Sequence, residues 1–458
     1  MKKLKLVIGI FLLFIIVISG VSTYFFFPIM SGFSAKAACS CVFNSGRSLD
    51  DVVANELSIL PLNLTTVSVD YKDSSATAKV FGFAIKKAIF RKGLGCTLLN
   101  NTKENVLRNN TFVTTLASSI KPDSVDWPLG NKGMFSSQSS FDSIQLNQAF
   151  NYAFTSSQNK SLYGTRSLIV VHHGKIIKEQ YLQGFTPNMP QTGWSMAKSI
   201  TNALMGILVK EGKLTVSQNN LFPAWGKDNR KNITIGNLLN ANSGLLWKEI
   251  YTMPSPATRM LYQEDDMPRY AINFKLDEKS GEHFKYSSGT SNIISGIIRK
   301  QTGAGYYNFV YEKLLHKIGM NSAVMEPDAG GTFVGSSYCF ASARDWARFG
   351  LLYLNDGMVN GERILPEGWV KYTATPASGA LKGEYGAQFW LNAGAPGNPA
   401  NRTYPDVPPD CFYAEGYQGQ QVYIIPSYDV VVVRLSLQTT SAFDENKFLA
   451  EVLKAVKK

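Results

Sequence analysis

Two groups of β-rich runs, far apart in the chain, constrain its fold more than any other sequence feature. Residues 168–181 hold two such runs around a His-Gly turn, and residues 421–437 hold two more around Pro-Ser-Tyr-Asp, so each group predicts a hairpin. Apolar residues at helical spacing follow in 448–456, and the pattern of 195–370 is mainly helical. The sequence therefore predicts a mixed α and β fold. An antiparallel sheet built from both ends of the domain is flanked by helices and carries an inserted helical region.

The amino terminus has the pattern of an export or anchor segment. Three lysines among the first five residues precede 25 uncharged, mostly apolar residues from Leu6 to Met30. A helix of that length is about 37 Å long and can cross a hydrocarbon core of ~30 Å. The lysines stay cytoplasmic by the positive-inside rule, which places the rest of the chain outside the cytosol. Ala35-Lys36-Ala37 resembles a signal-peptidase site, but the long apolar run favours a retained anchor. We expect residues 1–35 to be a membrane anchor or signal segment.

Residues 36–130 are expected to be an N-terminal extension, and the sequence assigns no role to it. Outside the cytosol its cysteines can oxidise. Cys39 or Cys41 could pair with Cys96, and Cys339 with Cys411, or all five could remain buried thiols.

Charge and metal-ligand spacing exclude two classes of protein. The formal charge is +12, but the basic residues are dispersed and no nucleic-acid motif accompanies them, so we expect no nucleic-acid partner. The four His residues lack zinc-site spacing, and no Cys-x-x-Cys has a second ligand pair. Neither a metal nor another cofactor is predicted.

Ser195 and Lys198 are the first residues whose spacing suggests catalysis. They open an apolar stripe of helical period, so Ser195 lies at a helix start and Lys198 follows on the same face. The positive end of a helix dipole favours a developing alkoxide or oxyanion. A Lys in a partly dry site loses its proton more easily and can activate the hydroxyl. Because a Ser at a helix start is usually only an N-cap, this pair alone does not establish a catalytic site.

Two later segments strengthen the catalytic interpretation of Ser195 and Lys198. Residues 232–245 (NITIGNLLNANSGL) and 281–296 (GEHFKYSSGTSNIISG) follow in order. Together with Ser195-Met196-Ala197-Lys198 they resemble the motifs of the class C β-lactamase and penicillin-recognising serine hydrolase superfamily, over about residues 130–458. The resemblance implies a β-lactamase/transpeptidase-like fold for residues 131–458, with Ser195 as nucleophile and Lys198 and Tyr286 as proton carriers.

The segment around Tyr286 adds two further candidates. A phenol beside a cationic Lys is expected to ionise more readily and to shuttle a proton to the leaving group. Ser288 stands where the superfamily often has Asn. Asn292 either supplies an amide to the substrate or caps the next helix.

The third motif departs from the superfamily pattern. Residues 411–420 (CFYAEGYQGQ) stand where a strand with Lys/His-Thr/Ser-Gly is expected, and the cation is missing. The glycine-rich end resembles 6-aminohexanoate-oligomer amidases and related esterases. It implies that backbone amides near Gly416, Tyr417 and Gln418 complete an oxyanion hole with the Ser195 amide. Because the missing cation binds the β-lactam carboxylate, tight β-lactam binding is not expected. Residues 394–410 form either a rim over the substrate or a plain surface loop.

The sequence thus predicts an extracytoplasmic serine hydrolase that cleaves an ester or amide bond of a small-molecule or peptide-like substrate through an acyl-enzyme. Three alternatives remain. The first is β-lactamase or D-Ala-peptidase activity. The second is an α/β-hydrolase with His283 or His316 as base, although the Pro-rich segment before Ser195 is unlike a nucleophile elbow. The third is a non-catalytic cell-envelope binding protein that retains the fold.

Overall fold

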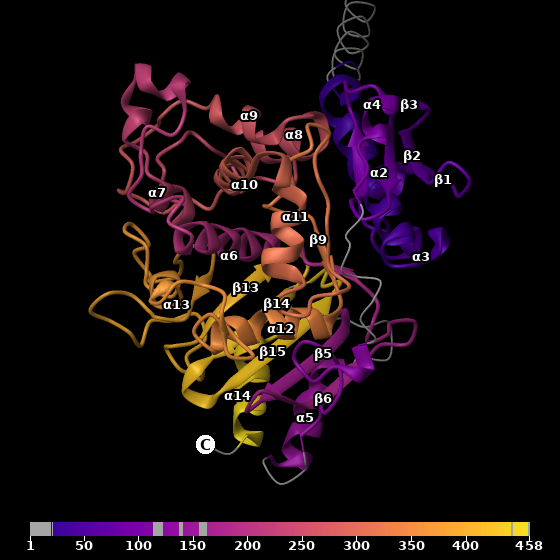
Figure 1. The fold of residues 1–458 in the computed structure, drawn as a ribbon. Helices are drawn as coiled ribbons and strands as arrows, with labels where there is room; N and C mark the ends of the chain where they lie inside the picture. Colours follow the sequence, from indigo (N-terminus) through magenta and orange to yellow (C-terminus); the bar gives the residue numbers. More distant parts are fainter. Residues whose placement is uncertain are drawn as a thin grey trace, which may run out of the picture.

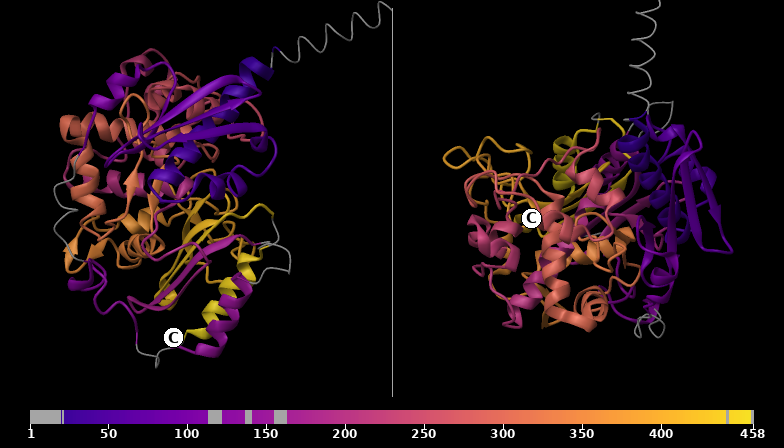
Figure 2. Two further views of the ribbon diagram at one scale, coloured as in Figure 1. Left: turned by 90° about the vertical axis from the view of Figure 1, so that its right-hand side faces the viewer. Right: turned by 90° about the horizontal axis from the view of Figure 1, so that it is seen from above.

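The computed structural model describes residue 20 and residues 22–112, 122–136, 141–154, 163–440 and 443–456 (Figure 1). Most of the predicted anchor, residues 1–19 and 21, lies outside the described residues. The described chain forms two parts. A larger domain contains the sheet and the helical region, and a smaller part, the N-terminal block (residues 22–112), lies along one side of it (Figures 1 and 2).

A six-stranded antiparallel sheet forms the centre of the larger domain. Its strand order is β12-β13-β14-β15-β5-β6. The two predicted hairpins are β5–β6 and β14–β15, and β15 pairs with β5, with Val432 opposite Val170. The prediction of a sheet built from both ends of the domain is therefore confirmed. The strands are β5 (Thr165–His172), β6 (Lys175–Tyr181), β12 (Trp390–Leu391), β13 (Phe412–Gly416), β14 (Gln420–Ile425) and β15 (Val430–Ser436).

Helices cover both faces of this sheet, because alternate strand residues point to opposite sides. Leu168 and Val170 face α5 (Ser143–Phe154) and α14 (Glu445–Ala455), whereas Ile169 and Val171 belong to the core under α12 (Ala343–Leu354). Strands β5 and β15 are buried throughout, which explains their nearly continuous apolar sequences.

The inserted helical region lies on the side of α12 that faces away from the sheet (Figure 1). Within this region, helix α6 lies on the side that faces the sheet, and it packs against α10 (Figure 1). Its helices are α6 (Ala197–Lys210), α7 (Ile235–Leu239), α8 (Pro256–Gln263), α9 (Met267–Ile272), α10 (Ser288–Thr302) and α11 (Tyr306–Val310), with α13 (Trp369–Thr373) following α12. A small sheet of β7 (Gln191–Thr192), β9 (Cys339–Ala341) and β8 (Val324–Met325) leads into α6.

The N-terminal block is helix α2 (Phe27–Phe43) packed on a four-stranded antiparallel sheet. The strands β1 (Thr65–Asp70), β2 (Ser75–Val80), β3 (Phe83–Arg91) and β4 (Gly95–Leu99) pair in that order, and the short helices are α3 (Leu49–Ala54) and α4 (Glu104–Asn109). The expected boundary at residue 35 falls inside α2, because Met30 and Ala35 are already buried. The globular part therefore begins at about Phe27, within the segment that the sequence assigned to the anchor.

One of the expected disulfides is present. Cys39 in α2 is bonded to Cys96 in β4. Cys41, Cys339 and Cys411 are buried free thiols, so the expected Cys339–Cys411 pair is wrong. The disulfide holds α2 on the sheet of the N-terminal block.

Two buried ionic clusters join the N-terminal block to the larger domain. Glu326 accepts hydrogen bonds from the Lys36 ammonium, the Ser40 hydroxyl, the Asn44 amide and the Cys96 amide. In the second cluster Arg47 and Arg166 both bond to Glu56. Buried ion pairs contribute little net stability, but they require specific geometry. These clusters therefore fix the position of α2 relative to the larger domain.

Candidate active site

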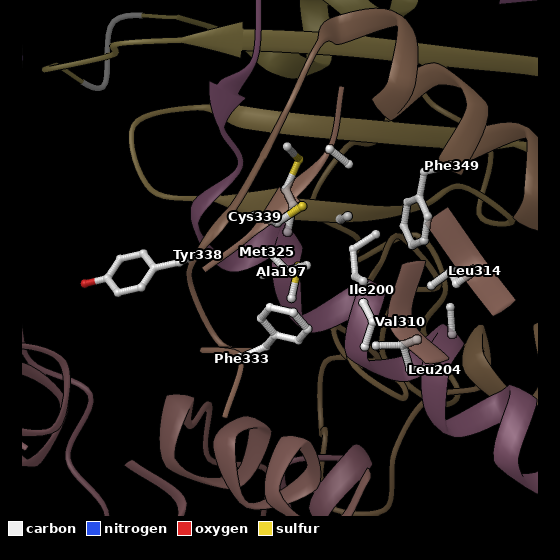
Figure 3. Close-up of a cluster of buried hydrophobic side chains, with 14 of the residues drawn as sticks. Ala197, Ile200, Leu204, Val310, Leu314, Met325, Phe333, Tyr338, Cys339 and Phe349 are labelled. Atoms are coloured by element: carbon white, nitrogen blue, oxygen red, sulfur yellow. The ribbon is translucent and has the colours of Figure 1, made fainter. Parts of the chain in front are cut away.

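Ser195 lies in a tight turn that leads directly into α6. Residues Trp194–Met196 form one turn of 3₁₀ helix, and α6 continues from Ala197. Ile200 and Leu204 of α6 pack against Val310, Leu314 and Phe349 (Figure 3). This packing anchors the helix that carries both Ser195 and Lys198.

Lys198 is the buried partner of Ser195. Its side chain is only 2% exposed, and Nζ lies 3.1 Å from Ser195 Oγ, 3.0 Å from Ser288 Oγ and 2.8 Å from the Ser336 carbonyl oxygen. Burial disfavours the charged amine and lowers the pKa of Lys198 to about 8, although the nearby Glu249 carboxylate opposes the shift. About one tenth of Lys198 is therefore neutral at pH 7, far more than for an exposed lysine.

Glu249 holds Ser288 in place. Its carboxylate accepts hydrogen bonds from the Ser288 amide at 3.0 Å, the Ser288 hydroxyl at 2.5 Å, the Trp247 indole at 2.5 Å and the Tyr251 phenol at 2.5 Å. Because the Ser288 hydroxyl donates to Glu249, its oxygen is left to accept from Lys198. Ser288 therefore lies between a carboxylate and the lysine, rather than replacing an Asn that would donate to substrate.

Tyr286 lies on the other side of Ser195. Lys198 Nζ is 4.8 Å from the centre of its ring, and the phenol lies near enough to the Ser195 hydroxyl to influence its own pKa. The ring stacks on Trp390 at 5.3 Å and meets Tyr385 edge-on at 5.8 Å. Burial, with Tyr385 nearby, raises the pKa of Tyr286 well above its ordinary value. The expectation that this phenol ionises more readily is therefore wrong, and Tyr286 is a neutral donor.

The strand β13 ends against the turn that carries Ser195. A Cβ atom on Gly416 would lie 2.1 Å from the Gly193 carbonyl oxygen, so only glycine allows this approach. Tyr417 follows, with its ring half exposed and edge-on to Trp194 at 5.8 Å. Gln418 turns the chain back with a φ of 64°, and its carbonyl oxygen accepts from Ser436 and Gln438. The Ser195 N–H lies in a first helical turn, where amides have no partner within the helix.

Asn292, expected either to supply an amide to the substrate or to cap a helix, lies inside α10 and is held by Ser336. It is 1% exposed, its amide donates to Ser336 Oγ at 3.1 Å, and its carbonyl oxygen accepts from the Ser336 amide. The Ser336 carbonyl in turn accepts from Lys198. Asn292 thus positions the peptide that binds the lysine.

A cavity lies beside Trp194 between the two parts of the molecule. The N-terminal block and the larger domain both contribute to its wall: Phe33, Lys36, Ser40 and Arg47 on one side, and Trp194, Tyr262, Tyr338 and Gln418 on the other. The N-terminal block therefore borders a cavity that reaches Trp194, the residue before Ser195.

Comparison with known proteins agrees with this geometry. The sequence model of the family described as Beta-lactamase matches residues 163–456. The chain belongs to the beta-lactamase family. It is a serine hydrolase with the mixed helix and antiparallel-sheet fold of that family. The α/β-hydrolase alternative is wrong, because the sheet is antiparallel and the hydroxyl of Ser195 meets Lys198 and Tyr286.

Several known proteins are similar to this chain in sequence or in structure. The 6-aminohexanoate-dimer hydrolase of Paenarthrobacter ureafaciens is 23% identical over 297 residues, which cover 59% of this chain and 72% of that protein. A putative 6-aminohexanoate-dimer hydrolase from Bacillus anthracis has a TM-score of 0.53 at 23% identity, covering 63% of this chain and 77% of that chain. A putative beta-lactamase from Bacteroides dorei has a TM-score of 0.55 at 15% identity, covering 69% and 99%. These two structural likenesses show the fold.

Three residues of the site escaped the sequence analysis. Glu249 and Ser336 lie in irregular segments without periodicity, and each reaches Lys198 or its partner across a large sequence separation. Trp194 lay beside Ser195 but carried no signal of its role. Only its φ of 45° and its aromatic contacts distinguish it.

Proposed function

We propose that this protein is a membrane-anchored, extracytoplasmic hydrolase that cleaves an ester or linear amide through a Ser195 acyl-enzyme. The hydrogen bonds of Lys198 carry the proposal. A neutral amine has two N–H groups, and two of its three neighbours can only accept: the Ser336 carbonyl oxygen, and Ser288 Oγ, whose proton is on the bond to Glu249. The lone pair of Nζ is then left for the hydroxyl proton of Ser195.

The reaction follows from this arrangement. Ser195 Oγ attacks the carbonyl carbon while its proton passes to Lys198, and the Ser195 amide with the amide near Tyr417 stabilises the oxyanion. Tyr286, a neutral phenol beside Ser195, donates a proton to the leaving group and recovers one from the Lys198 ammonium. Water then cleaves the acyl-enzyme by the reverse sequence of proton transfers.

The residues of strand β13 indicate which class of substrate suits the site. Its sequence, FYAEG, has Ala414 and Glu415 but no Lys or His. A carboxylate at this position of a substrate therefore lacks a cationic partner on the strand. The missing cation disfavours β-lactams and D-Ala peptides. An uncharged ester or a linear amide, the latter being the bond that the name of the Paenarthrobacter 6-aminohexanoate-dimer hydrolase implies for that enzyme, suits the site better.

The amino terminus and the disulfide both support a location of the folded part outside the cytosol. The lysines before Leu6 keep that end in the cytoplasm, so the folded body is outside. The Cys39–Cys96 bond is in keeping with an oxidising compartment. Cleavage after Ala37 would remove more than half of α2, including the buried Lys36 and the partly buried Phe33, so we propose that the segment is retained.

Labelling with a fluorophosphonate probe and hydrolysis of a nitrophenyl ester by the full chain test the catalytic part. We expect the label on the peptide containing Ser195, and a loss of at least about 1,000-fold in kcat/KM for Ser195→Ala and Lys198→Met. His283→Ala, which changes an exposed side chain bonded to Glu278, is the matched control and should retain activity. Undiminished labelling of Ser195→Ala would disprove the assignment. Nitrocefin turnover more efficient than ester turnover would instead favour the β-lactamase alternative.

A further inference from the structure

Exposed apolar side chains of the N-terminal block gather around the turn between β2 and β3. Phe81, Phe83 and Ile85 are 63%, 61% and 64% exposed. Leu64 is 40% exposed and lies beside them, because the next residue, Thr65, pairs with Val80. We call these four residues the hairpin patch. Clusters of large exposed apolar side chains mark surfaces that contact a partner or a membrane.

The backbone of the turn is strained at Phe81, whose ring belongs to the hairpin patch. Val80 pairs with Phe83, so the turn consists of two residues, Phe81 with a φ of 48° and Gly82 with a φ of 84°. Such turns favour Asn-Gly. A residue with a Cβ is strained in the left-handed conformation, because the Cβ atom crowds the carbonyl oxygen. Phe81 bears this strain while its ring stays mostly exposed, so its packing within the protein does not explain its presence.

The position of the turn relative to α2 identifies the partner. The Phe81 ring lies 5.9 Å from the ring of Phe27, the first residue of α2, and β3 contacts residues 22–26. The apolar segment that precedes α2 runs from Leu6 to Phe26, 21 residues. As a helix it is about 31 Å long, which matches a hydrocarbon core of ~30 Å. Phe27 then lies at the outer surface of the bilayer, and Phe81 lies there with it.

We propose that the hairpin patch inserts into the outer interface of the phospholipid membrane that holds the N-terminal segment. The inference rests on the proposed anchoring. Tyr24 and Phe25, 73% and 43% exposed, extend the same apolar surface at the depth where aromatic side chains gather in membrane proteins. Lys79, exposed on β2 two residues before Phe81, lies within reach of lipid phosphates.

This second attachment has a consequence for the enzyme. A single membrane helix allows the folded part of the chain to rotate relative to the membrane, whereas a helix and an inserted hairpin together hold it in one orientation. Phe33, six residues after Phe27 in α2, stacks on Trp194. The hairpin patch therefore also fixes the height of the Ser195 site above the lipid.

Fluorescence of the full chain in vesicles of phosphatidylcholine and phosphatidylglycerol tests the proposal. Phe83→Cys is labelled with an environment-sensitive NBD probe. The matched control is Tyr71→Cys, whose side chain is 64% exposed in the turn at the opposite end of β2. The three native free thiols are buried, and the wild type treated in the same way measures background labelling. We expect blue-shifted emission and several-fold stronger quenching by doxyl-labelled lipid at position 83 than at position 71. Equal emission and quenching at the two positions would overturn the proposal.

Flotation and activity measured in parallel separate the possible failures. If the full chain does not float with vesicles, the anchoring and the hairpin inference both fail. If the chain floats but the probe at position 83 stays in water, only the hairpin inference fails. Hydrolysis of a soluble ester by Phe83→Cys should stay within about twofold of wild type, since the patch is remote from Ser195, and its loss would show that the patch belongs to the catalytic site instead.

Discussion

The ring of Phe33 in helix α2 stacks on the indole of Trp194, with 5.9 Å between centroids and 19° between planes. Trp194 immediately precedes Ser195 and has a φ of 45°, a conformation that costs energy for a residue with a bulky side chain. Tyr338 and Tyr417 flank the same indole at 6.1 Å and 5.8 Å. The N-terminal block thus helps to hold the backbone beside Ser195.

This contact predicts that Phe33→Ala reduces catalysis as well as stability. Its matched control is Phe43→Ala, because Phe43 is also a partly buried ring of α2 but stacks on Phe90, within the N-terminal block. Removing either ring should lower the free energy of unfolding by about 1–3 kcal/mol. Only Phe33→Ala should reduce kcat on a nitrophenyl ester, by about tenfold or more, in protein still folded by its thermal melt. An equal loss of kcat in both variants would contradict the specific role of Phe33.

The lowered pKa of Lys198 predicts a rate that rises with pH. Only the neutral amine can take the Ser195 proton, and the pKa of Lys198 is about 8. The neutral fraction grows about tenfold per pH unit below that value and saturates above it. The kcat/KM for an uncharged ester should therefore rise with unit slope from pH 6 to about 7.5 and level off above pH 8.5. A profile that is flat from pH 6 to 9 would rule out Lys198 as the titrating base.

Glu249→Gln tests the electrostatic link between Glu249 and Lys198. The Glu249 carboxylate stabilises the Lys198 ammonium and so raises its pKa. Glutamine removes the charge but keeps one acceptor oxygen for Ser288, so the pKa of Lys198 should fall and the acid limb of the kcat/KM profile should move to lower pH.

The control for this prediction is Glu282→Gln, an exposed carboxylate in the segment before Tyr286. It removes the same charge elsewhere and should leave the midpoint of the pH profile unchanged. If Glu249→Gln leaves the midpoint in place or moves it upward, the direct coupling between the two groups is wrong.

Periodicity predicted the elements that position the site, and local sequence could not predict the contacts between them. The hairpins β5–β6 and β14–β15 and the helix that begins after Ser195 were predicted because alternating or helical apolar patterns reflect burial on one face. The burial of Tyr286, which reverses the expected direction of its pKa, depends on Trp390 and Tyr385 about a hundred residues away. The prediction of a Cys339–Cys411 disulfide was wrong for the same reason, because the spacing of two residues in the sequence does not determine the distance between them in the fold.

The boundary of the apolar N-terminal segment was misplaced because an apolar helix has the same composition in lipid as in a protein core. Helix α2 continues the apolar run but buries Met30 and Ala35 against protein. Lys36 is the distinguishing residue. It is 5% exposed and bonded to Glu326, a partner that lies 290 residues away in sequence.

The Lys36–Glu326 pair gives the last prediction. Glu326→Gln leaves the Lys36 ammonium buried without a counter-charge, so the free energy of unfolding should fall by about 3–5 kcal/mol. The double variant Lys36→Met/Glu326→Gln removes both charges and should recover most of that loss, because the glutamine oxygen can still accept from Ser40 or Asn44. The exposed pair Lys317–Glu362, at 3.0 Å, is the control, and breaking it should change stability by less than about 1 kcal/mol. Thermal or denaturant unfolding of the full chain measures the wild type and these three variants. A double variant no more stable than Glu326→Gln would show that the pair does not act as a compensated buried charge.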